Sequence, residues 1–159
     1  MNKKTSEKGI TLVALIMTII IMLILVVVTF NYSKNEIDKT RLESLKTNML
    51  LIKAKSKTIY ERYSFKEIDE LPGIEYNPSG SISGDYVISQ ELKTEISKNE
   101  GTFYILEKED LENMGLGTIE VDNEEFYIVD YESGEVFYAP GYTQDETTYY
   151  RLTDIQELK

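Results

Sequence analysis

The side chains that most often carry out catalysis are absent from this chain of 159 residues. It contains no His and no Cys, which excludes the commonest general base, the commonest metal ligand and any thiolate site. A Ser or Thr nucleophile would need a Lys or a carboxylate as its base. The 28 acidic residues are too numerous for any one pair to indicate a glycoside hydrolase. The sequence therefore predicts that the chain is not an enzyme and has no cofactor.

Two short segments resemble ligand sites only weakly. Asp122 and Glu124 carry oxygen ligands of the kind that Ca²⁺ prefers, but the spacing of an EF-hand loop is absent. We expect a solvated turn there and no metal site. Gly115 and Gly117 are close in sequence, yet the Lys and the preceding strand of a phosphate-binding loop are missing.

Charge is distributed unevenly along the sequence. Residues 31–62 contain eight basic and four acidic side chains, a net charge of +4. Residues 63–159 contain 6 basic and 23 acidic side chains, a net charge of −17. So acidic a segment repels nucleic acid and anionic lipid. We therefore expect no nucleic-acid partner, and a soluble C-terminal region outside the cell.

The longest feature of the sequence is an apolar stretch, residues 10–30, whose 21 residues include no charge. As a helix it would be roughly 31 Å long, the thickness of a bilayer's hydrocarbon core. A cleaved secretory signal is usually shorter and ends in a small-residue site, and a core helix is rarely apolar on all faces. A membrane anchor fits better, and Lys3, Lys4 and Lys8 before it place the N-terminus in the cytoplasm.

The residues that open this stretch, KGITLVAL from Lys8 to Leu15, resemble the prepilin signal of type IV pilins and type II secretion pseudopilins. That resemblance implies a leader peptide, residues 1–9, which a prepilin peptidase removes by cutting between Gly9 and Ile10. It also implies N-methylation of Ile10 and assembly with other pilin or pseudopilin subunits through the helix. The residues that begin this assembly helix are Thr11, Leu12, Val13, Ala14 and Leu15.

One position departs from the family pattern. Pilins usually carry Glu at the fifth mature position, which is thought to pair with the N-terminal amine of a neighbouring subunit, and this chain has Ala14 there. A carboxylate in hydrocarbon is costly unless it is paired, so it fixes the register between subunits. In type II secretion, the pseudopilin without this Glu is associated with the filament tip. Ala14 therefore favours a minor or tip subunit.

The helix is predicted to continue through residues 31–63, because no Pro or Gly occurs between Ile10 and Pro72. Apolar or small side chains recur at spacings of three and four and form one seam of an amphipathic helix. The residues of this seam are Leu42, Leu45, Met49, Ile52, Ser56, Ile59 and Tyr63.

Residues 64–159, the head, alternate short β-rich and helical segments. We expect strands at 85–89 and 102–106, helices at 90–98 and 107–114, and a hairpin formed by 125–131 and 135–138. Asn99 to Gly101 should cap the first helix, Pro140 and Gly141 should turn the chain away, and residues 149–152 should add an edge strand. The predicted class is α+β: a long N-terminal helix, transmembrane in its first half and amphipathic in its second, packed on a small antiparallel sheet, as in pilins.

Three functional hypotheses follow. The favoured one is a structural subunit, minor or at the tip, of a type IV pilus, competence filament or secretion pseudopilus. Such a subunit crosses the cell membrane once, with its head outside, before it joins a cell-surface filament. The alternative is a monomeric, membrane-anchored extracellular binding module, which needs no cut at Gly9. A surface enzyme is the third, and the poor inventory of catalytic side chains argues against it.

Overall fold

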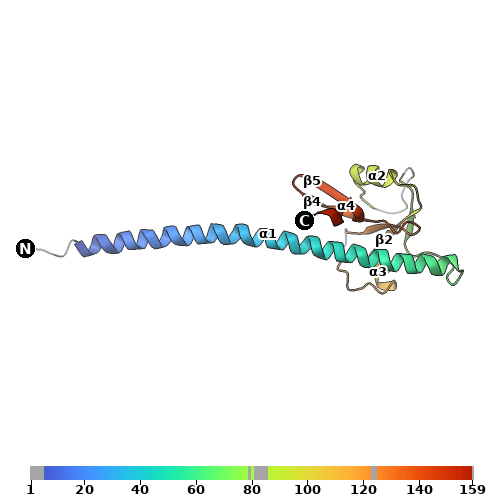
Figure 1. The fold of residues 1–159 in the computed structure, drawn as a ribbon, viewed down its shortest axis with the longest axis horizontal. Coiled ribbons are helices and arrows are strands. Elements are labelled where there is room, and N and C mark those ends of the chain that lie inside the picture. Colours follow the sequence, from blue (N-terminus) through green and yellow to red (C-terminus); the bar gives the residue numbers. More distant parts are fainter. Residues whose placement is uncertain (1–5, 79, 81–85, 123–124, 159) are drawn as a thin grey trace, which may run out of the picture. The chain divides into compact units, whose positions relative to one another are not determined.

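The structure, a computed structural model, describes residues 6–78, 80, 86–122 and 125–158; the side chains of residues 6–11, 28 and 30–35 are not described. The chain divides into two compact units, Met1–Arg41 and Leu42–Lys159. One helix of 59 residues, α1 (Ser6–Ser64), contributes to both units (Figure 1). The prediction of a single uninterrupted helix is confirmed. The second unit contains the C-terminal part of this helix, from Leu42, together with the head.

The predicted seam on α1 is confirmed over most of its length. Leu42, Met49, Ile52 and Ile59 are buried, because their spacing keeps them on one side of the helix. Ser56 lies in the same row and is fully buried, and Leu45 is half-buried. Tyr63 was predicted to complete the seam, but this was wrong: 41% of Tyr63 is exposed.

The C-terminal end of α1 is a Schellman motif. The N–H of Lys66 donates to the carbonyl of Tyr63 at 2.9 Å, and the N–H of Glu67 donates to the carbonyl of Arg62 at 2.9 Å. Lys66 adopts a φ of 58°, the left-handed conformation that Gly usually supplies here. Arg62 and Glu67 also form an ion pair at 3.3 Å. In most Schellman motifs the residues at these two positions make a hydrophobic contact instead.

Lys66→Gly is expected to stabilise the second unit by about 1 kcal/mol, because Gly adopts a positive φ without the steric cost of a Cβ. The measurement is urea unfolding followed by the near-ultraviolet circular dichroism of the tyrosines. Lys66→Ala is the matched control, since it removes the same charge but keeps the Cβ, and it should give no gain. Equal urea midpoints for Lys66→Gly and Lys66→Ala would show that the positive φ of Lys66 causes no measurable strain.

The head is built on a five-stranded sheet. Its strands are β1 (Ile74–Tyr76), β2 (Phe103–Leu106), β3 (Tyr127–Asp130), β4 (Val136–Gln144) and β5 (Thr147–Arg151). They lie in the order of the sequence, and each is antiparallel to the next. The predicted α+β class with an antiparallel sheet is confirmed. Strand β3 is central and every one of its residues is buried, which explains the aromatic and β-branched residues at its first three positions.

The predicted hairpin joins β3 to β4. Its turn closes through a hydrogen bond from the N–H of Gly134 to the carbonyl of Asp130 at 2.8 Å. Gly134 has a φ of 72°, a conformation that Gly adopts in turns without steric cost. The buried carboxylate of Asp130 accepts hydrogen bonds from the Glu132 N–H at 3.0 Å and the Ser133 hydroxyl at 2.5 Å.

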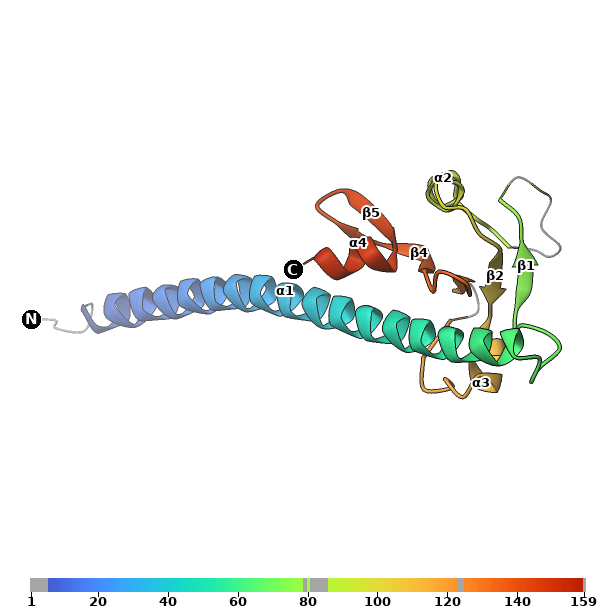
Figure 2. The same ribbon diagram turned by 45° about the vertical axis from the view of Figure 1, so that its right-hand side comes forward.

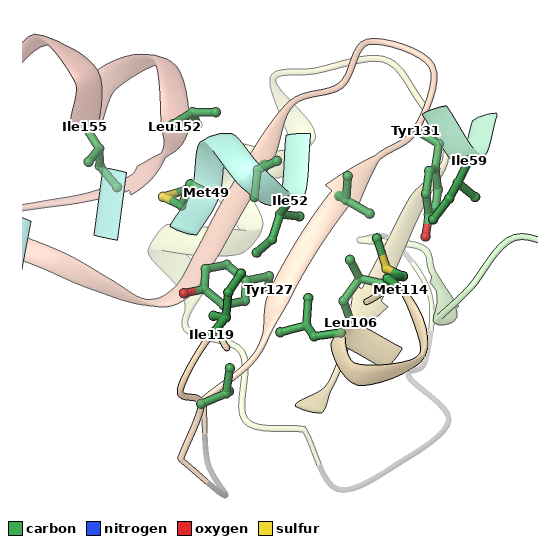
Figure 3. Close-up of a cluster of buried hydrophobic side chains, with 14 of the residues drawn as sticks. Met49, Ile52, Ile59, Leu106, Met114, Ile119, Tyr127, Tyr131, Leu152 and Ile155 are labelled. Carbon is green, nitrogen blue, oxygen red and sulfur yellow. The ribbon is translucent and has the colours of Figure 1, made fainter. Parts of the chain in front are cut away.

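Two hydrophobic cores cover the two faces of the sheet. The α1-side core joins the seam of α1 to one face of the sheet and to the helices α3 (Lys108–Asn113) and α4 (Leu152–Glu157). Figure 3 shows Met49 and Ile52 of α1 beside Tyr127, Leu152 and Ile155 in this core. The α2-side core joins the other face to the helix α2 (Gln90–Ser97), which Figure 2 shows across the sheet from α1. The second unit is therefore a three-layer arrangement of helix, sheet and helix.

Three predictions on the head need correction. Residues 86–89 form no strand; instead, the hydroxyl of Ser89 caps α2 by accepting the N–H of Leu92 at 3.1 Å. The cap at the end of α2 is Lys98, and Gly101 is needed because a Cβ there would lie 2.7 Å from Oδ2 of Asp130. Pro140 and Gly141 do not turn the chain away.

Strand β4 continues through Pro140 and Gly141 as a bulge. The pairing with β5 shifts register between Phe137 and Tyr142, and Gly141 takes a φ of 74°. A bulge bends a strand without ending it, so the predicted edge strand still forms, as β5.

The helix α4 was not predicted. Its buried Leu152 and Ile155 pack in the α1-side core. Its first turn is held by Glu135, which accepts the hydroxyl of Thr153 at 2.7 Å. Lys46 of α1 donates to the carbonyl of Leu158 at 2.8 Å and so ties the end of the chain to the seam helix.

Candidate assembly surface and processing site

The first unit presents an apolar surface on every side of α1. All side chains of residues 12–27 are exposed, and the exposed fraction of the large apolar ones runs from 45% at Ile20 to 69% at Met22. Contiguous apolar surface of this extent marks an interaction site in soluble proteins. Within the described residues, no helix combines the length and the apolar character needed to cross a membrane.

The hydroxyl groups within this surface are satisfied by the helix itself. Thr18 donates to the carbonyl of Leu15 at 2.8 Å, and Thr29 donates to the carbonyl of Leu25 at 2.7 Å. A buried hydroxyl without a partner costs about 1–3 kcal/mol. Because these two hydroxyls have partners within α1, the surface can enter an apolar environment without that cost.

The predicted cleavage point lies in the first turn of α1. The helix begins at Ser6, so the bond between Gly9 and Ile10 follows its fourth residue. The ends of a helix open more readily than its interior, and Gly further weakens a helix. This backbone can open for hydrolysis more easily than the interior of α1. The side chains of Ile10 and Thr11 lie outside the described ones.

The predicted assembly residues that are described lie together at the start of the apolar surface. Leu12, Val13 and Leu15 have exposed fractions of 59%, 58% and 61%, and Ala14 is also exposed. No acidic residue occurs from Gly9 to Asn35, so no nearby carboxylate replaces the one that the family pattern places at Ala14.

Of the two weak metal candidates, the structure describes only Asp122. Asp122 is exposed, and its carbonyl accepts the N–H of Glu125 at 3.0 Å in a turn. The carboxylate of Glu125 accepts the hydroxyl of Tyr138 at 2.9 Å, and Glu124 lies outside the described residues. Among the described residues, no group of three acidic side chains is placed to hold a metal ion.

Four tyrosines of the head form two aromatic pairs. Tyr127 and Tyr138 are opposite each other on β3 and β4, with ring centroids 5.3 Å apart. Burial, the largest cause, and the nearby charge of Glu125 raise the pKa of Tyr127 to about 12, against the opposing effect of a hydrogen bond with Asn48. Tyr104 and Tyr131 form an edge-to-face pair at 5.2 Å. Sequence reasoning missed that Tyr63 lies exposed near this second pair.

Comparison of the chain with models of known protein families, with curated proteins and with solved structures finds no match.

Proposed function

We propose that this chain is a structural subunit of a type IV pilus-like or pseudopilus filament. In this proposal, a prepilin peptidase cuts the chain between Gly9 and Ile10 and methylates the new N-terminus. The apolar helix then holds the subunit in the membrane until it enters the filament. The observation that carries the proposal is the prepilin-like segment from Lys8 to Leu15, followed directly by apolar side chains that are exposed all around α1.

The proposal that the subunit first resides in the membrane depends on the uncharged sequence of residues 10–30. The structure describes the side chains of residues 12–27 and 29 in this stretch. The lysines before the stretch favour a cytoplasmic N-terminus, on the side where the peptidase of the family acts. The acidic head would then lie outside the cell. The basic residues after Phe30, such as Lys34 and Lys39, would meet the lipid headgroups or solvent.

Assembly moves α1 from lipid to a core of neighbouring helices. Lipid tails are as apolar as Leu, so this step gains little from the hydrophobic effect and depends on close side-chain packing. The internal hydrogen bonds of Thr18 and Thr29 support it, because neither hydroxyl needs a partner from the neighbouring helix.

The direct test is the N-terminus of the chain purified from its native membrane. Intact-mass measurement and N-terminal peptide sequencing should find a chain that begins at Ile10 and carries one added methyl group. A chain that retains Met1, or one cut beyond Phe30, would overturn the proposal.

We further propose that the subunit is a minor or tip component, because Ala14 leaves no carboxylate to pair with the amine of a neighbouring subunit. Ala14→Glu is expected to increase severalfold the number of copies along the filament shaft, since a charge in an apolar core is stable only when it is paired. Immunogold labelling per length of filament measures this number. Ala14→Gln has nearly the same shape without the charge and should give no increase. An equal increase for both variants would show that pairing is not the cause.

A further inference from the structure

Glu75 and Tyr104 share one face at the β1 edge of the sheet. They lie directly opposite each other in the antiparallel pairing of β1 with β2, which places their side chains on one face with Cβ atoms about 5 Å apart. The next pair, Tyr76 and Phe103, is buried in the α2-side core. Glu75 and Tyr104 therefore point to the side of the sheet that α1 covers.

The ring of Tyr104 is held in place from behind. It packs edge-to-face on Tyr131, with centroids 5.2 Å apart and an angle of 71° between the rings. Tyr131 is in turn fixed by its hydroxyl, which donates to the carbonyl of Pro72 at 2.9 Å. Tyr104 is half-buried and Glu75 is exposed, so one aromatic face stands beside a carboxylate on a rigid support.

The last turn of α1 adds a second exposed ring. Tyr63 continues the seam by its spacing, yet 41% of it is exposed. Burial raises the pKa of Tyr104, and both Glu75 and Tyr63 lie near enough to raise it further. The pKa of Tyr131 is likewise raised by burial and then by Asp110. This edge of the head therefore gathers aromatic rings and carboxylates.

Among the described residues, Glu75 is paired with no Lys or Arg. In the part of the chain that the structure describes, the Glu75 carboxylate accepts no hydrogen bond within 3.5 Å and forms no ion pair within 4.0 Å. A carboxylate beside an aromatic face is the arrangement that attracts an ammonium or guanidinium group. A bare metal ion fits less well, since the described residues offer no set of three carboxylates here.

We propose that Tyr63, Glu75 and Tyr104 form a binding site for a Lys or Arg side chain of another polypeptide. Among the described strands, β1 pairs with β2 alone, so a neighbouring chain can approach along the other edge of β1. The head's excess of acidic residues also accelerates the encounter with a basic partner. This site does not depend on cleavage at Gly9, and it would serve a filament subunit and a monomeric module equally.

The test uses the full chain in detergent micelles, with carbon-13 in the tyrosine rings, titrated with acetylated tetralysine amide and followed by NMR. Saturable shifts are expected at the rings of Tyr63 and Tyr104. Glu75→Gln and Tyr104→Leu should each weaken binding about three- to fivefold, the size expected for one exposed charge pair or one exposed cation–π contact. Tyr104→Phe keeps the ring and should bind as the unaltered chain does.

Glu91→Gln is the matched control, because Glu91 is an exposed acid on α2, across the sheet. Unchanged shifts of the Tyr150 ring, which is buried in the α2-side core, would show that a variant remains folded. Equal weakening by Glu75→Gln and Glu91→Gln, or shifts that do not saturate, would overturn the site in favour of general attraction to an acidic surface. Shifts of the same size with choline chloride at equal concentration would overturn the assignment to a polypeptide side chain.

Discussion

Gly9→Phe is expected to leave the chain uncut, with Met1 or Asn2 at its N-terminus, and to abolish its incorporation into filaments. A bulky side chain next to the cleaved bond would block the close approach that Gly gives to the peptidase. The variant should still be found in the membrane fraction, because residues 10–30 are unchanged. Intact-mass measurement of the membrane fraction and of sheared filaments gives both results.

Gly80→Phe provides the control for a bulky residue in place of Gly. Among the described residues, a Cβ at Gly80 would meet no atom closer than 3.5 Å, and Gly80 is far in sequence from the bond to be cut, so processing should be normal. A Gly9→Phe chain that still begins at Ile10 would show that the resemblance to a prepilin signal is accidental. A chain that is uncut yet fully functional would instead support the monomeric, membrane-anchored module.

The fragment 42–159 is expected to fold cooperatively, whereas the fragment 64–159 should not fold. The shorter fragment lacks Leu42, Met49, Ile52 and Ile59, which are all buried in the α1-side core. Burial of one such side chain contributes about 1.5–3 kcal/mol, so four contribute about as much as the whole stability of a typical domain. The near-ultraviolet circular dichroism of the tyrosines and urea unfolding compare the two fragments.

Two neighbouring positions on α1, one buried and one exposed, test in the longer fragment whether burial of the seam stabilises the fold. Ile52 is fully buried and Leu51 is 44% exposed. Ile52→Ala should lower the free energy of unfolding by about 2–5 kcal/mol, and Leu51→Ala should lower it by less than about 1 kcal/mol. A cooperative transition of the fragment 64–159 would show that the head does not need the helix.

The features that sequence predicted well depend on local patterns. The seam of α1 follows from a 3.6-residue period, which needs no knowledge of the partner. The hairpin between β3 and β4 follows from two aromatic runs and Gly134 in the loop between them. The helix α3 (Lys108–Asn113) was predicted as residues 107–114, because the helical composition of this segment lies within a few residues.

The features that sequence missed depend on distant residues. Strand β1 forms by pairing with β2, which lies about 30 residues later in the sequence. The helix α4 is capped by Glu135, 18 residues away. Pro140 normally ends a strand, but here a bulge places it where no ladder hydrogen bond is needed. Tyr63 has the spacing of the buried seam, yet 41% of it is exposed, and its spacing alone does not reveal this.

The candidate assembly surface was readable from sequence because it is continuous along the chain. A long run of apolar residues in one helix predicts that the helix exposes apolar side chains wherever no other part of the fold covers it. The edge formed by Tyr63, Glu75 and Tyr104 was not readable, since its three residues come from three different elements. Only the register of β1 with β2 places Glu75 beside Tyr104.

The seam of α1 also determines how the second unit would respond to a pulling force. A force applied along α1 acts parallel to the row that contains Met49, Ile52 and Ile59. These side chains would carry the load together, because sliding the helix past the sheet disturbs all of them at once. Lys46 lies near the start of this row on α1 and donates a hydrogen bond to the carbonyl of Leu158. This bond also connects α1 to the end of α4. Resistance to force is set by the unfolding rate and not by equilibrium stability, so the head would yield in one abrupt step at high load.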